Sequence, residues 1–175
     1  DKLLGGPQAG LIAGRADLIA QIKSNPLKRA LRLDKMTLAA LAETLKLYNH
    51  PEKLRENLPT LRLITRPKAV IEELATSLLP EFASALGPQY SISVDDTLSQ
   101  IGSGSLPVET LPSSALRIEA VSGADSDLRT LGTAFRQLPQ PVIGRIHQGA
   151  LWFDLRCLED DQKAPLVQQL GELNL

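Results

Sequence analysis

The sequence of 175 residues is poor in cysteine and in aromatic residues, and it has no long apolar run. Its single cysteine, Cys157, excludes a disulfide within the chain and a zinc site built from several cysteines. Aromatic residues make up only 3%, so leucine, isoleucine, valine and alanine must form the core. No apolar stretch approaches the roughly 20 residues of a membrane-spanning helix. The low cysteine content fits a reducing, cytoplasmic setting.

The chain also lacks an excess of either charge. Nineteen lysines and arginines face 20 acidic residues, which gives a net charge of −1. A domain that binds nucleic acid through bulk electrostatics normally carries a basic excess, so any RNA contact must be local or come from sequence outside this chain. The first residues contain no methionine and no basic or apolar leader, and we expect the chain to be a piece of a longer protein.

The first 60 or so residues predict short helices separated by turns. Glycines around a short apolar run predict turns and a strand over residues 9–13 that ends at Gly14. Asn25 and Pro26 predict a helix start. The expected helices cover residues 17–23, 27–33, 35–49 and a short stretch that begins at Pro51 and ends at Pro59.

The second half changes to a mixed pattern. Helices are expected over residues 68–86, 126–138 and 162–173, with a kink or break at Pro80 in the first. Strands are expected over residues 90–94, 115–121, 142–146 and 151–155, the last two joined by a hairpin turn at Gln148 and Gly149. The pattern predicts an α+β fold with a small antiparallel sheet and helices on one face. Residues 1–60 are interpreted as the edge of a neighbouring domain with a connecting helix, and residues 61–175 as a small domain.

Three basic residues are the main candidates for chemistry. A nucleophilic lysine at Lys2 would need a lowered pKa, and the alternative is a solvated side chain at the chain end. Arg29 and Arg32 are three residues apart, so on a helix they would share a face and form a fork suited to phosphate or a similar oxyanion. The alternative for this pair is a solvated basic edge.

Other candidates carry weaker patterns. The loop around Gly102–Ser105 (residues 100–107) could border an active site or be a plain connection between strands. Arg145 and Arg156 are taken as structural, paired with Asp154 or Glu159. The two histidines have no partners at metal-ligand spacing, so no metal site is expected. Cys157 is expected to be a small core residue.

Separate blocks of the sequence resemble a known family. Residues 1–10 (DKLLGGPQAG) resemble the cofactor-lysine segment of bacterial selenocysteine synthase, also called L-seryl-tRNA(Sec) selenium transferase. The resemblance continues through residues 26–38 and returns at residues 99–107, 141–146 and 151–158. These blocks occur in the same order as in that family, and the chain therefore resembles a C-terminal fragment of one of its members.

The resemblance implies an enzyme of fold type I that uses pyridoxal 5'-phosphate, with an α/β parent fold. The lysine matching Lys2 would hold the cofactor as a Schiff base, and arginines matching Arg29 and Arg32 would bind the selenium donor. Seryl-tRNA(Sec) would lose its hydroxyl to give an aminoacrylyl-tRNA, to which selenium from selenophosphate adds. The implied parent is a cytoplasmic ring of dimers. Residues 1–60 would be the end of its large cofactor domain, and the fragment alone would be inactive.

Two alternatives remain at this point. The chain could belong to another fold type I enzyme, a lyase or transferase acting on a small amino acid or sugar acid. It could also be a non-catalytic oligomerisation module, because packing surfaces can survive where catalysis cannot. The sequence does not decide the role of the Gly102–Ser105 loop or of Arg145, or the order of Lys2 in a chain without the large domain.

Overall fold

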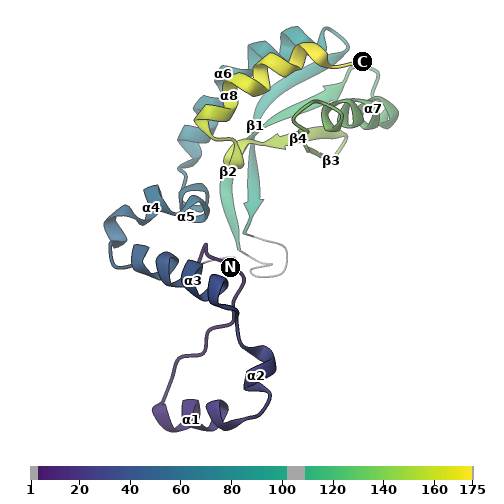
Figure 1. Cartoon of the computed structure of the whole chain (residues 1–175). Coiled ribbons are helices and arrows are strands. Elements are labelled where there is room, and N and C mark those ends of the chain that lie inside the picture. Colours follow the sequence, from purple (N-terminus) through teal and green to yellow (C-terminus); the bar gives the residue numbers. More distant parts are fainter. Residues whose placement is uncertain (1–3, 102–108, 175) are drawn as a thin grey trace. The chain divides into compact units, whose positions relative to one another are not determined.

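The chain separates into two compact units, Asp1–Thr65 and Arg66–Leu175. The structure, a computed structural model, describes residues 4–101 and 109–174 (Figure 1). In these ranges it contains eight α-helices and one antiparallel sheet of four strands. The predicted α+β class is confirmed.

The N-terminal unit consists of short helices. They are α1 (Ala16–Ser24), α2 (Lys28–Leu31), α3 (Lys35–Leu47), the 3-10 turn η1 (Pro51–Lys53), α4 (Leu54–Asn57) and α5 (Pro59–Ile64). Asp34 caps α3, since its carboxylate accepts hydrogen bonds from the backbone N–H groups of Met36 and Thr37 at 2.8 and 3.0 Å. The strand expected over residues 9–13 is wrong: these residues form irregular backbone with no strand partner in the described part of the chain. Pro59 begins a helix as well as ending one.

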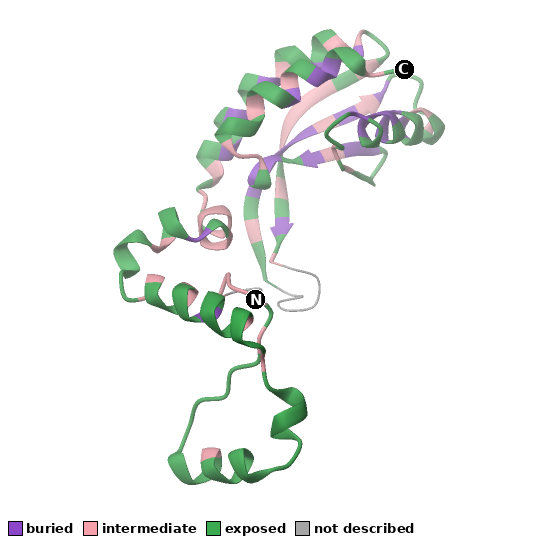
Figure 2. Cartoon of the chain, in the orientation of Figure 1, coloured by how far each residue is buried: buried purple, intermediate pink, exposed green. Residues whose placement is uncertain are grey.

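This unit has almost no buried core of its own. Among its described residues only Leu41 and Leu58 are buried, and most of the unit is exposed in Figure 2. The N-terminal segment is held on α3 where the Tyr48 hydroxyl donates to the Leu4 carbonyl at 3.0 Å. Large apolar side chains remain exposed along its length: Leu11, Ile12, Leu18, Ile22, Leu27, Leu31, Met36, Leu38 and Leu45. Apolar surface of this extent is characteristic of a segment that packs against other protein.

The C-terminal unit combines helices with the sheet. Its elements are α6 (Lys68–Leu86), β1 (Tyr90–Gln100), β2 (Thr110–Ala120), α7 (Asp125–Arg136), β3 (Arg145–His147), β4 (Ala150–Asp154), the 3-10 turn η2 (Leu155–Cys157), α8 (Asp160–Gln169) and the 3-10 turn η3 (Leu170–Glu172). The strand order is β1-β2-β4-β3, with every neighbouring pair antiparallel. The turn between β3 and β4 lies at Gln148 and Gly149, as predicted, and both residues have a positive φ.

One hydrophobic core joins the sheet to three helices. Leu116 lies opposite Phe153 and Ile118 opposite Leu151, so these four side chains share one face of the sheet. They pack in a single cluster with residues of α6, α7 and α8, among them Phe82, Phe135 and Leu166. The rings of Phe82, Phe135 and Phe153 lie together, with centroids 4.7–6.1 Å apart. The predicted arrangement of helices on one face is therefore confirmed.

Several expected elements differ from the structure. Helix α6 continues through Pro80 to Leu86, so the expected break is wrong. Strands β1 and β2 are both longer than predicted and pair over eleven positions, from Tyr90 opposite Ala120 to Gln100 opposite Thr110. The strand expected over residues 142–146 begins only at residue 145. The segment before it carries Gly144, where a Cβ atom would lie 2.8 Å from a Phe153 ring carbon and from the Trp152 carbonyl oxygen.

Candidate functional site

The residues expected to bind ligands lie in the N-terminal unit. Lys2 is outside the described residues. Arg29 belongs to α2, whereas Arg32 follows the last residue of that helix, and both side chains are exposed. Arg32 has extended backbone, with φ −69° and ψ 141°. The regular helical spacing that would place both guanidiniums on one face therefore stops at Leu31.

Arg32 instead shares a pocket with Lys28. This pocket, of about 530 Å³, has apolar walls that include Ile12, Ile22, Leu27, Leu31 and Leu33. Arg29 is not among the residues that line it. The side-chain oxygen of Asn25 accepts a hydrogen bond from the Leu27 N–H at 2.9 Å, so Asn25 holds the turn before α2. The sequence singled out this region but paired Arg32 with Arg29 rather than with Lys28.

The chemistry of this pocket suits a small oxyanion. Its lining contains two cations, Lys28 and Arg32, and no acidic or aromatic residue. Both cations can donate charge-assisted hydrogen bonds to phosphate-like oxygens. A pyridoxal ring also needs a partner for its ring nitrogen, and these lining residues supply no carboxylate. The pocket on its own therefore fits an oxyanion and does not fit the whole cofactor.

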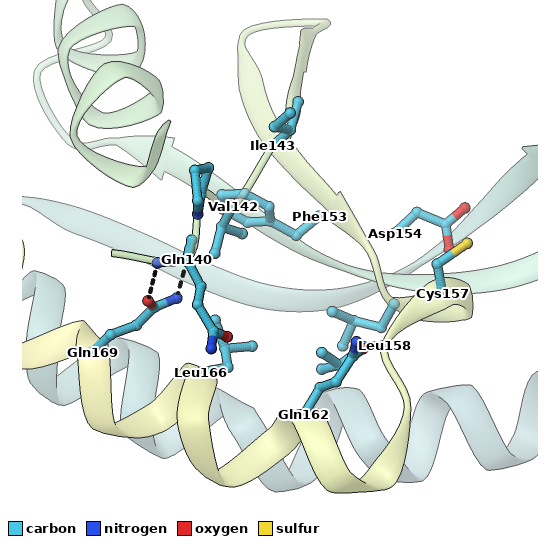
Figure 3. A pocket seen from close by; sticks show the side chains of 12 residues that line it. Gln140, Val142, Ile143, Phe153, Asp154, Cys157, Leu158, Gln162, Leu166 and Gln169 are labelled. Carbon is cyan, nitrogen blue, oxygen red and sulfur yellow. Dashed lines mark hydrogen bonds between the residues drawn. The ribbon is translucent and has the colours of Figure 1, made fainter. Parts of the chain in front are cut away.

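A second pocket, of about 310 Å³, lies in the C-terminal unit between residues 140–143, the end of β4 and α8 (Figure 3). Its walls combine apolar side chains, with Val142, Phe153 and Leu166 among them, with the polar side chains of glutamines and Asp154. At one end the Gln169 side-chain amide donates to the Gln140 carbonyl at 2.9 Å and accepts from the Gln140 N–H at 3.0 Å. This reciprocal pair fixes the irregular segment after α7 to α8.

Cys157 lies at the rim of this second pocket. It is exposed, so the prediction of a core residue is wrong. Partial burial of the sulfur, and then the nearby carboxylate of Asp154, raise the pKa of the Cys157 thiol. A thiol with a raised pKa holds less thiolate at neutral pH and is therefore a weaker nucleophile.

Sequence reasoning missed a polar cluster at the end of β4, in which Ser99, Ser113 and Arg156 are buried. The carboxylate of Asp154 accepts hydrogen bonds from the hydroxyls of Ser99 and Ser113 and from the Arg156 N–H. Arg156 is only 6% exposed, and its Nε donates to the Ser99 hydroxyl at 3.0 Å. Ser99 and Ser113 lie 41–57 positions from their partners Asp154 and Arg156, so no local pattern could have joined the serines to them.

The remaining candidates have simple surroundings. Arg145 donates to the Thr97 hydroxyl at 3.1 Å. The loop around Gly102–Ser105 lies outside the described residues. Within the described ranges, no group of three or more His, Cys, Asp or Glu side chains is placed to hold a metal ion. In the same ranges no helix has the length and apolar character needed to cross a membrane.

Comparison with known proteins gives one consistent result. The family model described as SelA, L-seryl-tRNA selenium transferase, matches residues 1–159. L-seryl-tRNA(Sec) selenium transferases from Escherichia coli O139:H28 (strain E24377A / ETEC) and from Shigella boydii serotype 18 (strain CDC 3083-94 / BS512) are each 58% identical over 163 residues. The aligned region is 93% of this chain but only 35% of each relative. The resemblance read from the sequence blocks is thereby confirmed, and the chain belongs to the L-seryl-tRNA selenium transferase family.

Proposed function

We propose that the chain is the C-terminal part of an enzyme that converts seryl-tRNA(Sec) to selenocysteinyl-tRNA(Sec), with selenophosphate as donor and pyridoxal 5'-phosphate as cofactor. The observation that carries this proposal is the 58% identity across 93% of the chain to proteins named as L-seryl-tRNA(Sec) selenium transferases. The chain spans about a third of their length, so the activity belongs to the longer protein. The isolated chain is expected to be inactive.

In this proposal the two halves of the chain belong to different domains. Residues 1–60 are the end of the large cofactor domain with its connecting helix, and residues 61–175 are the small domain. The exposed apolar side chains of the N-terminal unit support this division, because they need other protein to cover them. The large domain and further copies in a homo-oligomer would supply that cover. A cytoplasmic location follows from the tRNA substrate.

Lys2 is proposed as the residue that holds the cofactor. Bound pyridoxal 5'-phosphate would supply an electron sink for the reaction at the seryl group. The amine of Lys2 would then be free to accept and return a proton once the substrate amine has taken its place.

Arg29 and Arg32 are proposed to bind the selenium donor. Arg32 has structural support from its pocket, where Lys28 adds a second cation. Both side chains are exposed and can therefore reach an anion. Planar guanidiniums bind tetrahedral oxyanions through paired hydrogen bonds, which orient the donor as well as hold it. Lys28 is an added candidate from this pocket.

The test of the cofactor assignment uses the full-length protein. Replacement of Lys2 by alanine is expected to abolish the visible absorbance of bound pyridoxal 5'-phosphate, because the covalent attachment is lost. A Lys23→Ala variant, which removes an exposed lysine of α1, is the matched control and should keep the spectrum. An unchanged spectrum in Lys2→Ala would refute the assignment.

The test of the anion site compares substitutions at three arginines. Arg29→Ala and Arg32→Ala are expected to raise the KM for selenophosphate by about 10-fold or more, which corresponds to loss of one charge-assisted hydrogen bond. Cofactor absorbance should be unchanged. Arg55→Ala, an exposed arginine of α4, serves as the control. Equal loss of donor use and cofactor binding, or loss of neither, would count against the site.

A further inference from the structure

The strongest unexplained feature of the C-terminal unit is the buried side chain of Arg156. A guanidinium taken out of water must have its donors satisfied, or it destabilises the fold. Three nitrogens of Arg156 reach three separate segments. Its Nε donates to Ser99 at the end of β1, its Nη2 to the Pro112 carbonyl at the start of β2, and its Nη1 to the Arg66 carbonyl at 3.0 Å.

Arg66 returns this interaction. It is the first residue of the C-terminal unit, and its side chain is 12% exposed. Its Nη1 donates to the Leu158 carbonyl and, at 3.4 Å, to the Arg156 carbonyl, while its Nη2 lies 3.5 Å from a carboxylate oxygen of Asp160. Each arginine therefore binds the backbone carbonyl of the other. We call Arg66 and Arg156 the arginine clasp.

Asp154 completes the cluster around the clasp. One of its oxygens accepts from Ser99, and the other accepts from Ser113 and from the Arg156 N–H. The Ser99 hydroxyl has one proton, which it gives to Asp154, and it uses a lone pair to accept from Arg156. The end of β1, the start of β2 and the turn η2 are thus joined through one set of charged hydrogen bonds, which are stronger than neutral ones.

We propose that the arginine clasp is a positioning device that couples the first residue of the C-terminal unit to the paired ends of β1 and β2. Arg66 reaches neither strand in any contact the structure gives for it, yet it holds the carbonyls of η2 and so fixes the backbone that carries Arg156. Arg156 in turn holds both strand ends. A change at Arg66 is transmitted to residues 97–100 and 110–113 through the Arg156 side chain and through the Asp154 carboxylate, which accepts from the Arg156 N–H and from both serines.

Coupling through the arginine clasp predicts a different result from a purely local structural role of Arg66. If Arg66 only tied down η2, its removal would loosen residues 155–160 and nothing else. If it were a general stability contact, its removal would loosen the whole unit evenly. Coupling predicts a third pattern, in which the strand ends loosen while the rest of the sheet does not, because the core cluster holds Leu116, Ile118 and Leu151 independently of the clasp.

The experiment is hydrogen exchange followed by mass spectrometry on the 175-residue chain. Arg66→Ala is expected to raise exchange at residues 97–100 and 110–113 by about 10-fold or more, the size expected for loss of a buried charged hydrogen bond. Exchange in β4 and in the middle of α6 should stay unchanged. The control is Arg136→Ala, which removes an arginine of α7 whose side chain bonds only to Thr133 among the contacts given for it.

Two further variants test whether the charge of Arg66 is sufficient and whether the strand contact of Arg156 can be removed separately. Arg66→Lys keeps the charge but replaces the guanidinium, whose Nη1 reaches two carbonyls while its Nη2 faces Asp160, with a single nitrogen, so it should loosen the strand ends nearly as much as Arg66→Ala. Ser99→Ala removes one strand contact and leaves Arg66 in place, so it should loosen β1 without affecting residues 155–160. Exchange confined to residues 155–160, a uniform rise across the unit, or full protection in Arg66→Lys would each overturn the proposal. These readouts do not involve the enzymatic reaction, so the proposed function can fail without affecting them.

Discussion

Two neighbouring serines of β2 show how much a single hydroxyl depends on its partner. Ser113 and Ser114 are both fully buried. Ser113 donates to the carboxylate of Asp154 at 2.7 Å. Within residues 4–101 and 109–174, the Ser114 hydroxyl has no hydrogen-bond partner. The two serines are equally buried, but within the described residues only Ser113 makes a side-chain hydrogen bond, so substitutions at the two positions can be compared for their effect on stability.

We expect Ser113→Ala to lower the free energy of unfolding by about 0.5–1.5 kcal/mol, because it removes the hydrogen bond from a buried hydroxyl to the Asp154 carboxylate. Ser114→Ala should be neutral or stabilising by up to about 1 kcal/mol, since it removes an unsatisfied buried group. Denaturant unfolding of the 175-residue chain measures both values. An equal loss of stability in the two variants would contradict this account.

At this scale the sequence predicted the types of residue better than their partners. The fork of Arg29 and Arg32 was inferred from spacing, but the helix ends before Arg32 and brings that side chain to a pocket with Lys28. Arg156 was rightly taken as structural, yet its link to Ser99 depends on strand pairing across 57 positions. Contacts of this length follow from tertiary structure and leave no local pattern.

Among the elements, helix α6 was the most predictable. Its bounds, residues 68–86, agree with the structure, because its apolar positions repeat at helical spacing over five turns. Pro80 does not end it, since packing of Ile71, Leu78 and Phe82 in the core outweighs the local cost of the proline. Strands β1 and β2 were underestimated because their outer halves are rich in serine, threonine and aspartate, which lower the local strand signal.

The end of α6 provides a test of this local control. Gly87 has φ 69° and ψ −171°, a region that is essentially restricted to glycine. Gly87→Ala should lower the free energy of unfolding by about 1–3 kcal/mol, the cost of that backbone strain.

Gly171, in the turn after α8, is the matched control. It is exposed, has no positive φ, and a Cβ atom there would meet nothing within 4 Å. Gly171→Ala should change stability by no more than about 0.5 kcal/mol. Thermal or denaturant melts compare the two, and equal effects would show that the conformation of Gly87 is not what ends the helix.

At the scale of the whole molecule, the two units differ in what holds them. Among its described residues, the C-terminal unit has a continuous core of eighteen buried apolar residues. The N-terminal unit buries only Leu41 and Leu58 among its described residues. The sequence predicted the mixed fold and the sheet of the second unit from periodicity. It also predicted helices for the first unit, although it missed α5 after Pro59, and periodicity alone does not reveal that a helix lacks something to pack against.

We therefore expect residues 66–175 alone to fold and to unfold cooperatively, with a midpoint within a few degrees of the complete chain. Residues 1–65 alone should give the circular dichroism spectrum of a largely unfolded chain, because short isolated helices are marginal in water. Circular dichroism on heating tests both pieces. A cooperative melt of residues 1–65 would contradict the view that this unit needs other protein.

The strand order β1-β2-β4-β3 has a consequence for how the C-terminal unit assembles. The hairpin of β1 and β2 can form early during synthesis. The second neighbour of β2 is β4, which begins about 30 residues later in the chain, after α7. Until β4 docks, one side of β2 and the apolar side chains beneath it stay open to water. Completion of the sheet is thus a late step that waits for β4, and a chain interrupted before residue 150 would expose the unpaired edge of β2 to aggregation.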